Sequence, residues 1–293
     1  MCDVACVPAT QQTEVLSTAR GKFECFSDDD VTQHLRRFGA HQGSELSIAL
    51  DCVRPGDAIV DVGAHVGTFS VPLAQRVGEA GRVTAFEGAA DTYSLLLRNL
   101  EANGCANVDP VHAVVSSEAG GSFRKADPEA PAGSTHFEPA DEGGGVTAVT
   151  LDQWRQGAPR PVRFIKLDIE GHELDALRGA ERLLREDRPI VLLEISRSQL
   201  RRRGSSLRDL DRVLSGYHLF VNLASRSSEQ GYRLARLPRL ALLRAGGRDF
   251  GHLDALAVPP GSDRYPRNYS GQATTLRLLA SSGLRALGRR VRG

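Results

Sequence analysis

Acidic residues stand at the ends of several apolar segments of this 293-residue chain, and their spacing is typical of a ligand site. Asp61 follows "DAIV", Glu87 ends "GRVTAFE", and Asp168 follows "VRFIKL". A carboxylate can accept hydrogen bonds from ribose hydroxyls, attract a cationic group, or take a proton from a reacting hydroxyl. The sequence therefore predicts a site at which carboxylates from separate segments meet.

The stretch "DVGAHVGTFS", residues 61–70, predicts a loop that passes close under that ligand. A dinucleotide fingerprint requires G-x-G-x-x-G, but His65 and Thr68 stand where its second and third glycines belong. A P-loop requires a lysine directly after Gly67, and none is there. Both phosphate-binding motifs are therefore excluded, and what remains is a strand, a G-x-x-x-G loop that starts at Gly63, and a helix.

The residues around this loop suit a nucleoside that carries a cationic group. Glu87 can accept hydrogen bonds from two ribose hydroxyls, and Asp61 can attract an ammonium or sulfonium group. S-adenosylmethionine (SAM) has all of these features, so we expect it as the ligand. The alternative is that both acids only end their strands.

The elements that must position these residues alternate between strand and helix from Asp57 onward. Hydrophobic residues make up 41% of the chain, enough for a sizeable core. Alternation of this kind is typical of a parallel sheet with helices on both faces. We expect strands near residues 57–62, 81–87, 107–116, 162–171, 189–196 and 217–223, with "LDALAVPP" closing the sheet. The connecting helices are expected near residues 69–77, 91–104 (with Asp91 as the cap), 172–186 and 205–215.

The chain divides into three expected parts. Residues 1–53 form a lead-in, which is loose or partly ordered over 1–26 and then helical over 28–39 and 44–53. Residues 54–260 form the catalytic domain, and residues 261–293 form a basic tail. Within the domain, the Gly- and Pro-rich residues 119–145 predict a surface flap that helps to shape the pocket. The tail has seven arginines and no acid after residue 263, so we expect a solvated or frayed helix, or one that touches an acidic surface.

Composition excludes some classes of partner. The formal net charge is only +1, and we find neither a basic face nor an N/D-P-P-[YF] motif, so no nucleic acid is expected. The sequence has no long apolar run and no signal-like start, so the cytoplasm is the expected compartment. Five widely spaced cysteines without a CxxC pair predict reduced thiols.

Several segments together resemble the FkbM-type methyltransferases. They are, in order, "PGDAIVDVGAHVGTFSVPLA", "GRVTAFE", "LLLRNLEANG", "TLDQW", "FIKLDIEGHELDALRGAERLL" and "RPIVLLEIS". The resemblance implies a Rossmann-like class I SAM-dependent fold with a mostly parallel seven-stranded sheet. It also implies O-methylation of a natural product, small molecule or glycan, as in secondary metabolism. Two departures are Gly88, where the family usually has proline, and His172, where a small residue is common.

The expected site residues follow from the motifs and this resemblance. We expect cofactor contacts from one set of residues: Asp61, Gly63, Ala64, His65, Gly67, Glu87, Ala113 and Asp168. The candidates for proton transfer are Asp168, His172 and Glu194, with Asp168 favoured. Asp168 and Glu170 would share a face if the strand continued that far. Asp168, Glu170 and Glu194 are also candidate ligands of a Mg²⁺ ion, although their spacing is not diagnostic of a metal site.

Alternative functions remain open at this point. The chain could be a non-catalytic SAM-fold binding or scaffold protein, or an N-methyltransferase that acts on a small molecule. The three acids Asp61, Glu87 and Asp168 favour an enzyme over a scaffold. A homodimer is also compatible with the sequence.

Overall fold

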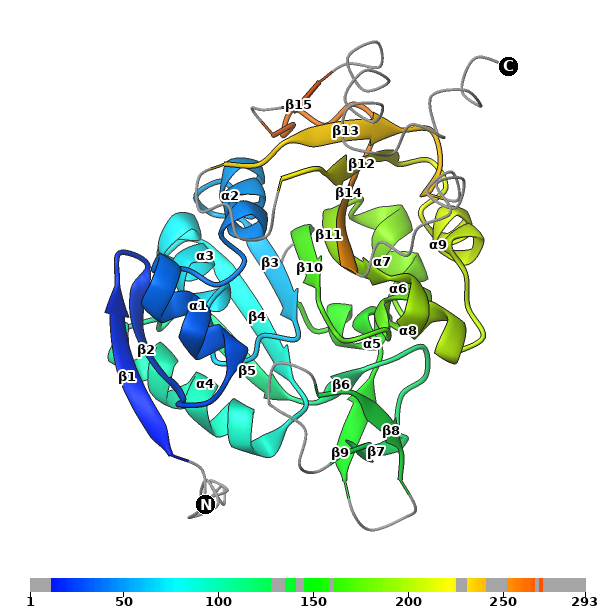
Figure 1. The fold of residues 1–293 in the computed structure, drawn as a ribbon. Coiled ribbons are helices and arrows are strands. Elements are labelled where there is room, and N and C mark those ends of the chain that lie inside the picture. The colour runs from blue at the N-terminus through cyan, green and yellow to red at the C-terminus, as the bar shows by residue number, and fades with distance from the viewer. Residues whose placement is uncertain are drawn as a thin grey trace.

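A computed structural model describes residues 12–127, 135–140, 145–158, 161–224, 231–240 and 252–266, and the backbone of 269–270. Its centre is a nine-stranded sheet in the order β15-β13-β12-β14-β11-β10-β3-β4-β5 (Figure 1). These strands are β3 (Ala58–Val62), β4 (Arg82–Glu87), β5 (Val108–His112), β10 (Val162–Leu167), β11 (Ile190–Ser196), β12 (His218–Asn222), β13 (Leu234–Leu237), β14 (His252–Val258) and β15 (Tyr269–Ser270).

The sheet confirms the expected fold class and adds two strands to it. Strands β5, β4, β3, β10 and β11 are parallel, and β14 lies antiparallel between β11 and β12. Seven strands from β5 to β12 therefore form the expected mostly parallel sheet. Strands β13 and β15 extend it beyond β12, and β13 is antiparallel to β12.

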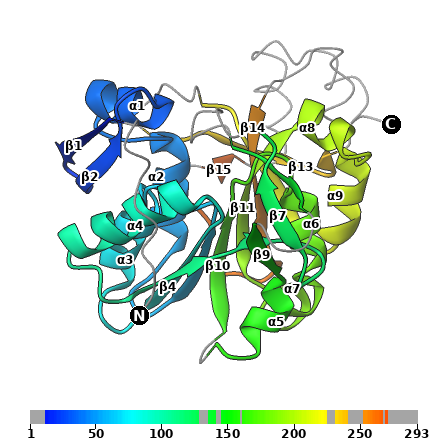
Figure 2. The ribbon, with the colours of Figure 1, turned by 90° about the horizontal axis from the view of Figure 1, so that it is seen from below.

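Helices cover both faces of the sheet because its central strands are apolar on both sides. In β11, Ile190 and Leu192 belong to one buried cluster, whereas Val191 and Leu193 belong to the other. The first cluster includes residues of α1 (Asp30–Phe38), α2 (Gly43–Cys52), α3 (Ser70–Val77) and α4 (Ala90–Ala102). The second includes residues of α5 (Leu151–Arg155), α6 (Glu173–Arg178), α7 (Glu181–Glu186), α8 (Arg197–Arg202) and α9 (Leu207–Val213). Figure 2 shows these two groups of helices on opposite sides of the sheet.

The N-terminal segment is more regular than the loose or partly ordered lead-in that we expected. Residues 13–26 form a hairpin of β1 (Thr13–Thr18) and β2 (Gly21–Phe26), which packs beside α4. Two asparagines of α4 bind β2 as a neighbouring strand would. The Asn99 amide accepts from Glu24 N at 2.7 Å and donates to Glu24 O at 3.0 Å, and Asn103 does the same for Lys22 at 2.9 and 2.7 Å.

The spacings of helix and strand make this pairing possible. Four residues of α-helix rise about 6 Å, and two residues of strand rise about 6.6 Å. Asn99 and Asn103 can therefore lie opposite Glu24 and Lys22, respectively. A third Asn99 hydrogen bond, from Nδ2 to Val66 O at 2.8 Å, also connects α4 to the glycine loop.

Two helix predictions need correction. The N-cap of α4 is Ala89, and Asp91 lies inside the first turn, where it accepts from Thr92 N. The expected single helix over 172–186 is two helices, α6 and α7, which are separated at Gly179. A Cβ atom at Gly179 would lie 2.1 Å from the carbonyl oxygen of Ser116, so the close approach of that loop accompanies the break.

The expected flap contains regular structure. The segment 107–116 is two strands, because β6 (Val114–Val115) leaves the main sheet and pairs with β9 (Val146–Val149). Strands β7 (Ser122–Lys125) and β8 (Phe137–Pro139) complete a four-stranded sheet in the order β6-β9-β7-β8. This small sheet lies at the bottom of the molecule in Figure 1.

Three further expectations concern membrane-spanning helices, the cysteines and the basic tail. Within the described ranges, every helix is too short or too polar to cross a bilayer. Cys25, Cys52 and Cys105 are buried free thiols, as predicted. Cys2, Cys6 and the basic tail after residue 270 lie outside the described residues.

Candidate functional site

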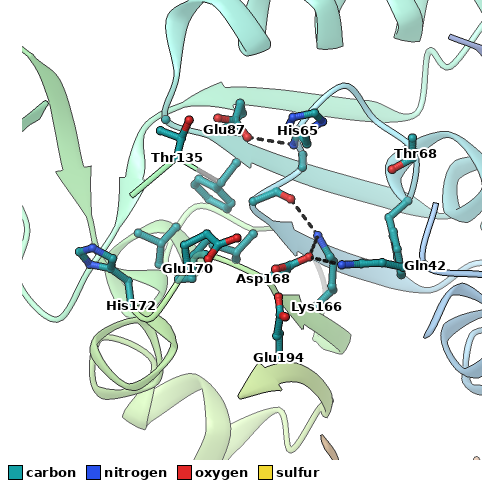
Figure 3. Close-up of a pocket in the computed structure, with 18 of the residues that line it drawn as sticks. Gln42, His65, Thr68, Glu87, Thr135, Lys166, Asp168, Glu170, His172 and Glu194 are labelled. Carbon is teal, nitrogen blue, oxygen red and sulfur yellow. Dashed lines mark hydrogen bonds and ion pairs between the residues drawn. The ribbon is translucent and has the colours of Figure 1, made fainter. Parts of the chain in front are cut away.

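A cavity of about 300 Å³ opens at the carboxyl ends of the central strands. The chain runs outward from β3 to β4 and β5, then returns to β10 on the other side of β3. Ligands of open α/β sheets bind at such a reversal of strand order. Residues after or at the ends of β3, β4, β10 and β11 line this cavity: Gly63, Glu87, Asp168 and Glu194 (Figure 3).

The glycine loop passes against the turn that follows β10. Gly63 has φ 78°, and a Cβ atom there would lie 2.0 Å from the Asp168 carbonyl oxygen. The backbone N–H groups of Gly63 and Ala64 both donate to Phe86 O at 3.0 Å. Gly63, Ala64 and His65 line the cavity, whereas Gly67 lies behind it against Leu96.

Glu87 is fixed by backbone hydrogen bonds at the end of β4. Its two carboxylate oxygens accept from His65 N at 2.9 Å and Ala89 N at 2.8 Å. The side chain borders the cavity, as does Ala113 after β5. The structure thus brings Glu87, Ala113 and the glycine loop to one side of the pocket, where the sequence predicted a nucleoside.

Lys166 joins the two aspartates that were expected at the site. Its Nζ lies 3.4 Å from Asp61 Oδ1 and 3.7 Å from Asp168 Oδ2, and donates to Gly63 O at 2.8 Å. Burial disfavours the charged amine, but Asp61 and Asp168 outweigh it and raise the pKa of Lys166. Asp61 is fully buried, accepts from Ser70 Oγ at 2.7 Å, and is not among the residues that line the cavity. The cationic group beside Asp61 is therefore the Lys166 amine, whereas we expected an ammonium or sulfonium group of the ligand there.

Asp168 is strongly held in its ionised form. Burial alone would raise its pKa, but the charge of Lys166 and hydrogen bonds from neighbouring side chains, the Gln42 amide among them, hold that pKa well below its usual range. Gln42 Nε2 donates to Asp168 Oδ2 at 3.0 Å. The sequence drew no attention to Gln42, which precedes α2 and has φ 50°.

A second acidic pair lies beside Asp168. Glu194 of β11 hydrogen-bonds with His252 Nδ1, which β14 brings next to β11. Glu170 also lines the cavity, but not through a shared strand face with Asp168, because β10 ends at Leu167. Burial and the neighbouring carboxylates of Glu194 and Asp168 raise the pKa of Glu170 to about 7.

His172 lies apart from this acidic group in Figure 3. Its Nε2 is 2.9 Å from Phe137 O in the small sheet and 3.0 Å from the Arg203 guanidinium. Burial, followed by the charge of Arg203, lowers the pKa of His172 to about 4. The ring is therefore neutral at pH 7, and it contacts the small sheet.

Segments outside the central sheet complete the pocket. Helix α1 contributes Asp30, Val31 and His34, and the small sheet and the loop before it contribute Phe137 and Thr135. These contacts agree with the expectation that the first helices and the flap shape the pocket. Among the described residues, no group of three or more His, Cys, Asp or Glu side chains is arranged to hold a metal ion, so the expected Mg²⁺ finds no support there.

Comparisons with known proteins agree with this architecture. The model of the methyltransferase FkbM domain matches residues 61–234, more than half of the chain. Hexuronic acid methyltransferase AglP of Haloferax volcanii is 24% identical over 193 residues, which cover 65% of this chain and 75% of that protein.

Solved structures show a more distant likeness. Methyltransferase FkbM from Methylobacillus flagellatus KT is 18% identical, with a TM-score of 0.44, and the match covers 77% of this chain and 51% of that one. Aeropyrum pernix fibrillarin in complex with natively bound S-adenosyl-L-methionine is 14% identical, with a TM-score of 0.42, and the match covers 85% of this chain and all (100%) of that one.

Proposed function

Because this chain belongs to the FkbM methyltransferase family, we propose that it uses SAM to methylate a hydroxyl group of a small molecule, natural product or sugar. The observation that carries the proposal is the position of two acids. Glu87 and Asp168 line the same cavity from two different strand ends, and the Gly63 loop lies between them. Strand ends of this kind form the ligand crevice of open α/β sheets.

The residues on the Glu87 side fit the nucleoside of SAM. The absence of a side chain at Gly63 keeps the loop close to Asp168, and Ala64 and His65 continue it along the cavity wall. Glu87 is pre-positioned by two backbone N–H groups, and its oxygens have further lone pairs for the ribose hydroxyls. The small side chain of Ala113 leaves room for the adenine ring of SAM. Bound here, SAM supplies a methyl group on a sulfonium, which a hydroxyl oxygen can attack.

The residues on the Asp168 side can orient an acceptor. Asp168 stays ionised because Lys166 and Gln42 hold it, so it can accept a hydrogen bond from an acceptor hydroxyl or from the ammonium of SAM. Holding two reactants in line contributes about 7–11 kcal/mol in well-oriented intramolecular reactions. Glu194 supports Asp168 from the neighbouring strand.

The choice of a hydroxylated sugar as acceptor is supported by one relative. AglP is named as a hexuronic acid methyltransferase, and the match to it covers most of its length. Its identity to this chain is 24%, so the sugar class, rather than the particular sugar, is what we carry over.

The first test is calorimetric titration of the full chain with SAM, with S-adenosylhomocysteine, and with NAD as the negative control. We expect micromolar binding of the first two and none of NAD. Transfer is then followed as S-adenosylhomocysteine release with hydroxylated sugars, in wild type and in Asp168→Asn. The variant should bind SAM and lose most of the transfer.

Two results would overturn this proposal. A folded sample that binds no SAM would show that SAM is not the cofactor. SAM binding without transfer to any hydroxylated or amine acceptor would indicate a binding or scaffold protein, whereas transfer to amines alone would indicate an N-methyltransferase.

A further inference from the structure

Glu170 lies in a strained turn at the cavity wall. Its φ is 52°, in the left-handed region that residues other than glycine seldom adopt, and Gly171 follows with φ 98°. Glu173 stabilises this turn, because its Oε1 accepts from Ile169 N at 3.2 Å and Gly171 N at 3.1 Å. Backbone strain that the surrounding structure maintains is concentrated at functional sites. Glu170 lines the same pocket as Asp168.

Two of the other candidate bases in this pocket, Asp168 and His172, are poorly suited to take a proton, and the third, Glu194, is hydrogen-bonded to His252 Nδ1. Asp168 is bound to Lys166 and Gln42, and its pKa lies well below the usual range, so its affinity for a proton is low. His172 has its Nε2 against Phe137 O, and its pKa is lowered to about 4 by burial and then by Arg203. A general base is most effective when its pKa is near the working pH.

The environment of Glu170 differs from both. The groups around it come from every adjoining element: Asp168 after β10, Glu173 of α6, Glu194 of β11, Gln199 of α8 and His252 of β14. Burial, then the charges of Glu194 and Asp168, raise the pKa of Glu170 to about 7. The Gln199 amide, which donates to Glu170 Oε2, and His252 act in the opposite direction. Glu170 is thus a carboxylate that can both hold and release a proton near pH 7.

We propose that Glu170 is the catalytic base, and that Asp168 orients the acceptor without taking its proton. This inference rests on the proposed methyl transfer. The acceptor O–H proton moves to a Glu170 carboxylate oxygen as the acceptor oxygen forms its bond to the methyl carbon. The methyl–sulfur bond breaks, and its electron pair stays on sulfur as a neutral thioether. Glu170 then releases the proton to solvent. Gln199 is a positioning residue that acts through Glu170.

The test is the pH dependence of kcat for wild type and three variants at saturating SAM and acceptor. Wild type should lose activity below a pKa near 7. Glu170→Gln should lower kcat about 100- to 10,000-fold, the usual contribution of a general base, and remove this acidic limb. Gln199→Leu removes a donor that favours the charged carboxylate, so the limb should move to higher pH. Glu181→Gln, an exposed acid at the start of α7, serves as the matched control with an unchanged profile.

A second measurement does not depend on turnover. In the S-adenosylhomocysteine complex, difference infrared spectroscopy should show a carboxyl group that titrates near pH 7 in wild type and is missing in Glu170→Gln. The Glu173 carboxyl, whose pKa burial raises to about 8, should remain in the variant. An acidic limb that persists in Glu170→Gln, or no shift in Gln199→Leu, would refute the assignment while leaving methyl transfer intact. A wild-type chain that shows the titrating carboxyl but transfers no methyl group would refute the proposed function, and the base with it.

Discussion

Lys166→Met tests the electrostatic centre of the site, because Lys166 is the cation shared by two buried carboxylates. Its side chain is 7% exposed, and those of Asp61 and Asp168 are 0% and 19% exposed. Methionine retains most of the aliphatic volume, so the main change is the loss of charge. Breaking a buried ion pair by removing one partner costs about 3–5 kcal/mol. We expect a loss of that size in the free energy of unfolding at pH 7.

The assay is urea unfolding followed by tryptophan fluorescence and circular dichroism. Trp154 is the only tryptophan, and it packs edge-on against Phe86 with ring centroids 5.8 Å apart. Arg182→Met is the control, because Arg182 pairs with Glu186 at 2.9 Å and both side chains are about half exposed (59% and 49%). Exposed ion pairs contribute about 0–1 kcal/mol, so the control should change stability little.

The pH dependence of the stability difference tests whether the lost interaction is the ion pair of Lys166 with Asp168. Asp168 is held below its ordinary pKa in the folded state, so the stabilisation from its ion pair is fully present above about pH 4. It is lost as the pH falls through the lowered folded pKa. The difference between wild type and Lys166→Met should therefore be smaller at pH 3 than at pH 7. A difference below about 1 kcal/mol at pH 7, or one that does not change with pH, would refute this reasoning.

Three further changes test the cofactor side and the turn after β10. Glu87→Gln should weaken SAM binding about 10- to 100-fold, since a hydrogen bond to a charged group contributes about 1.5–3 kcal/mol. Calorimetry should find SAM binding unchanged in Asp109→Asn, the control, because the Asp109 side chain is 45% exposed and pairs with Arg82. Gly63→Ala should abolish SAM binding and lower the thermal midpoint, because the new Cβ would lie 2.0 Å from the Asp168 carbonyl oxygen; a wild-type midpoint would contradict this. Burial raises the pKa of Glu173 to about 8. The folded state therefore holds a proton that the unfolded state has lost, and the free energy of unfolding of wild type should fall as the pH rises from about 5 to 8. Glu173→Gln should make this fall shallower. Equal slopes in urea titrations would show that Glu173 does not titrate there.

Apolar spacing and helix-end residues predicted those strands and helices whose positions depend on the residues nearest to them in sequence. The apolar strand Ala58–Val62 and helix Asp30–Phe38, with Asp29 as its N-cap and a left-handed Gly39 at its end, lie where the sequence places them. The N-terminal hairpin was missed because β1 alternates only between exposed and intermediate residues and so lacks an apolar face, although β2 buries Phe23, Cys25 and Phe26. The break between α6 and α7 was missed because apolar spacing runs through it, while its tight contact with Ser116 is non-local.

The candidate site was predictable only at the ends of strands. Glu87, Asp168 and Glu194 follow apolar runs, and the structure brings all three to one cavity. His252 could not be found this way, because β14 inserts antiparallel beside β11 from far along the chain. The partner of Asp61 was also hidden: parallel pairing of β3 and β10 sets Lys166 opposite Asp61, and the sequence gives no sign of that register.

The asparagine pairing between α4 and β2 also bears on self-association. A strand edge with unpaired N–H and C=O groups is a template for pairing with another molecule. In this hairpin β1 covers one edge of β2, and the Asn99 and Asn103 amides occupy the backbone groups of Glu24 and Lys22 on the other. The two side chains thus close an edge that would otherwise invite edge-to-edge aggregation. Helix α4 thus covers the free edge of β2, as a neighbouring strand would in a larger sheet.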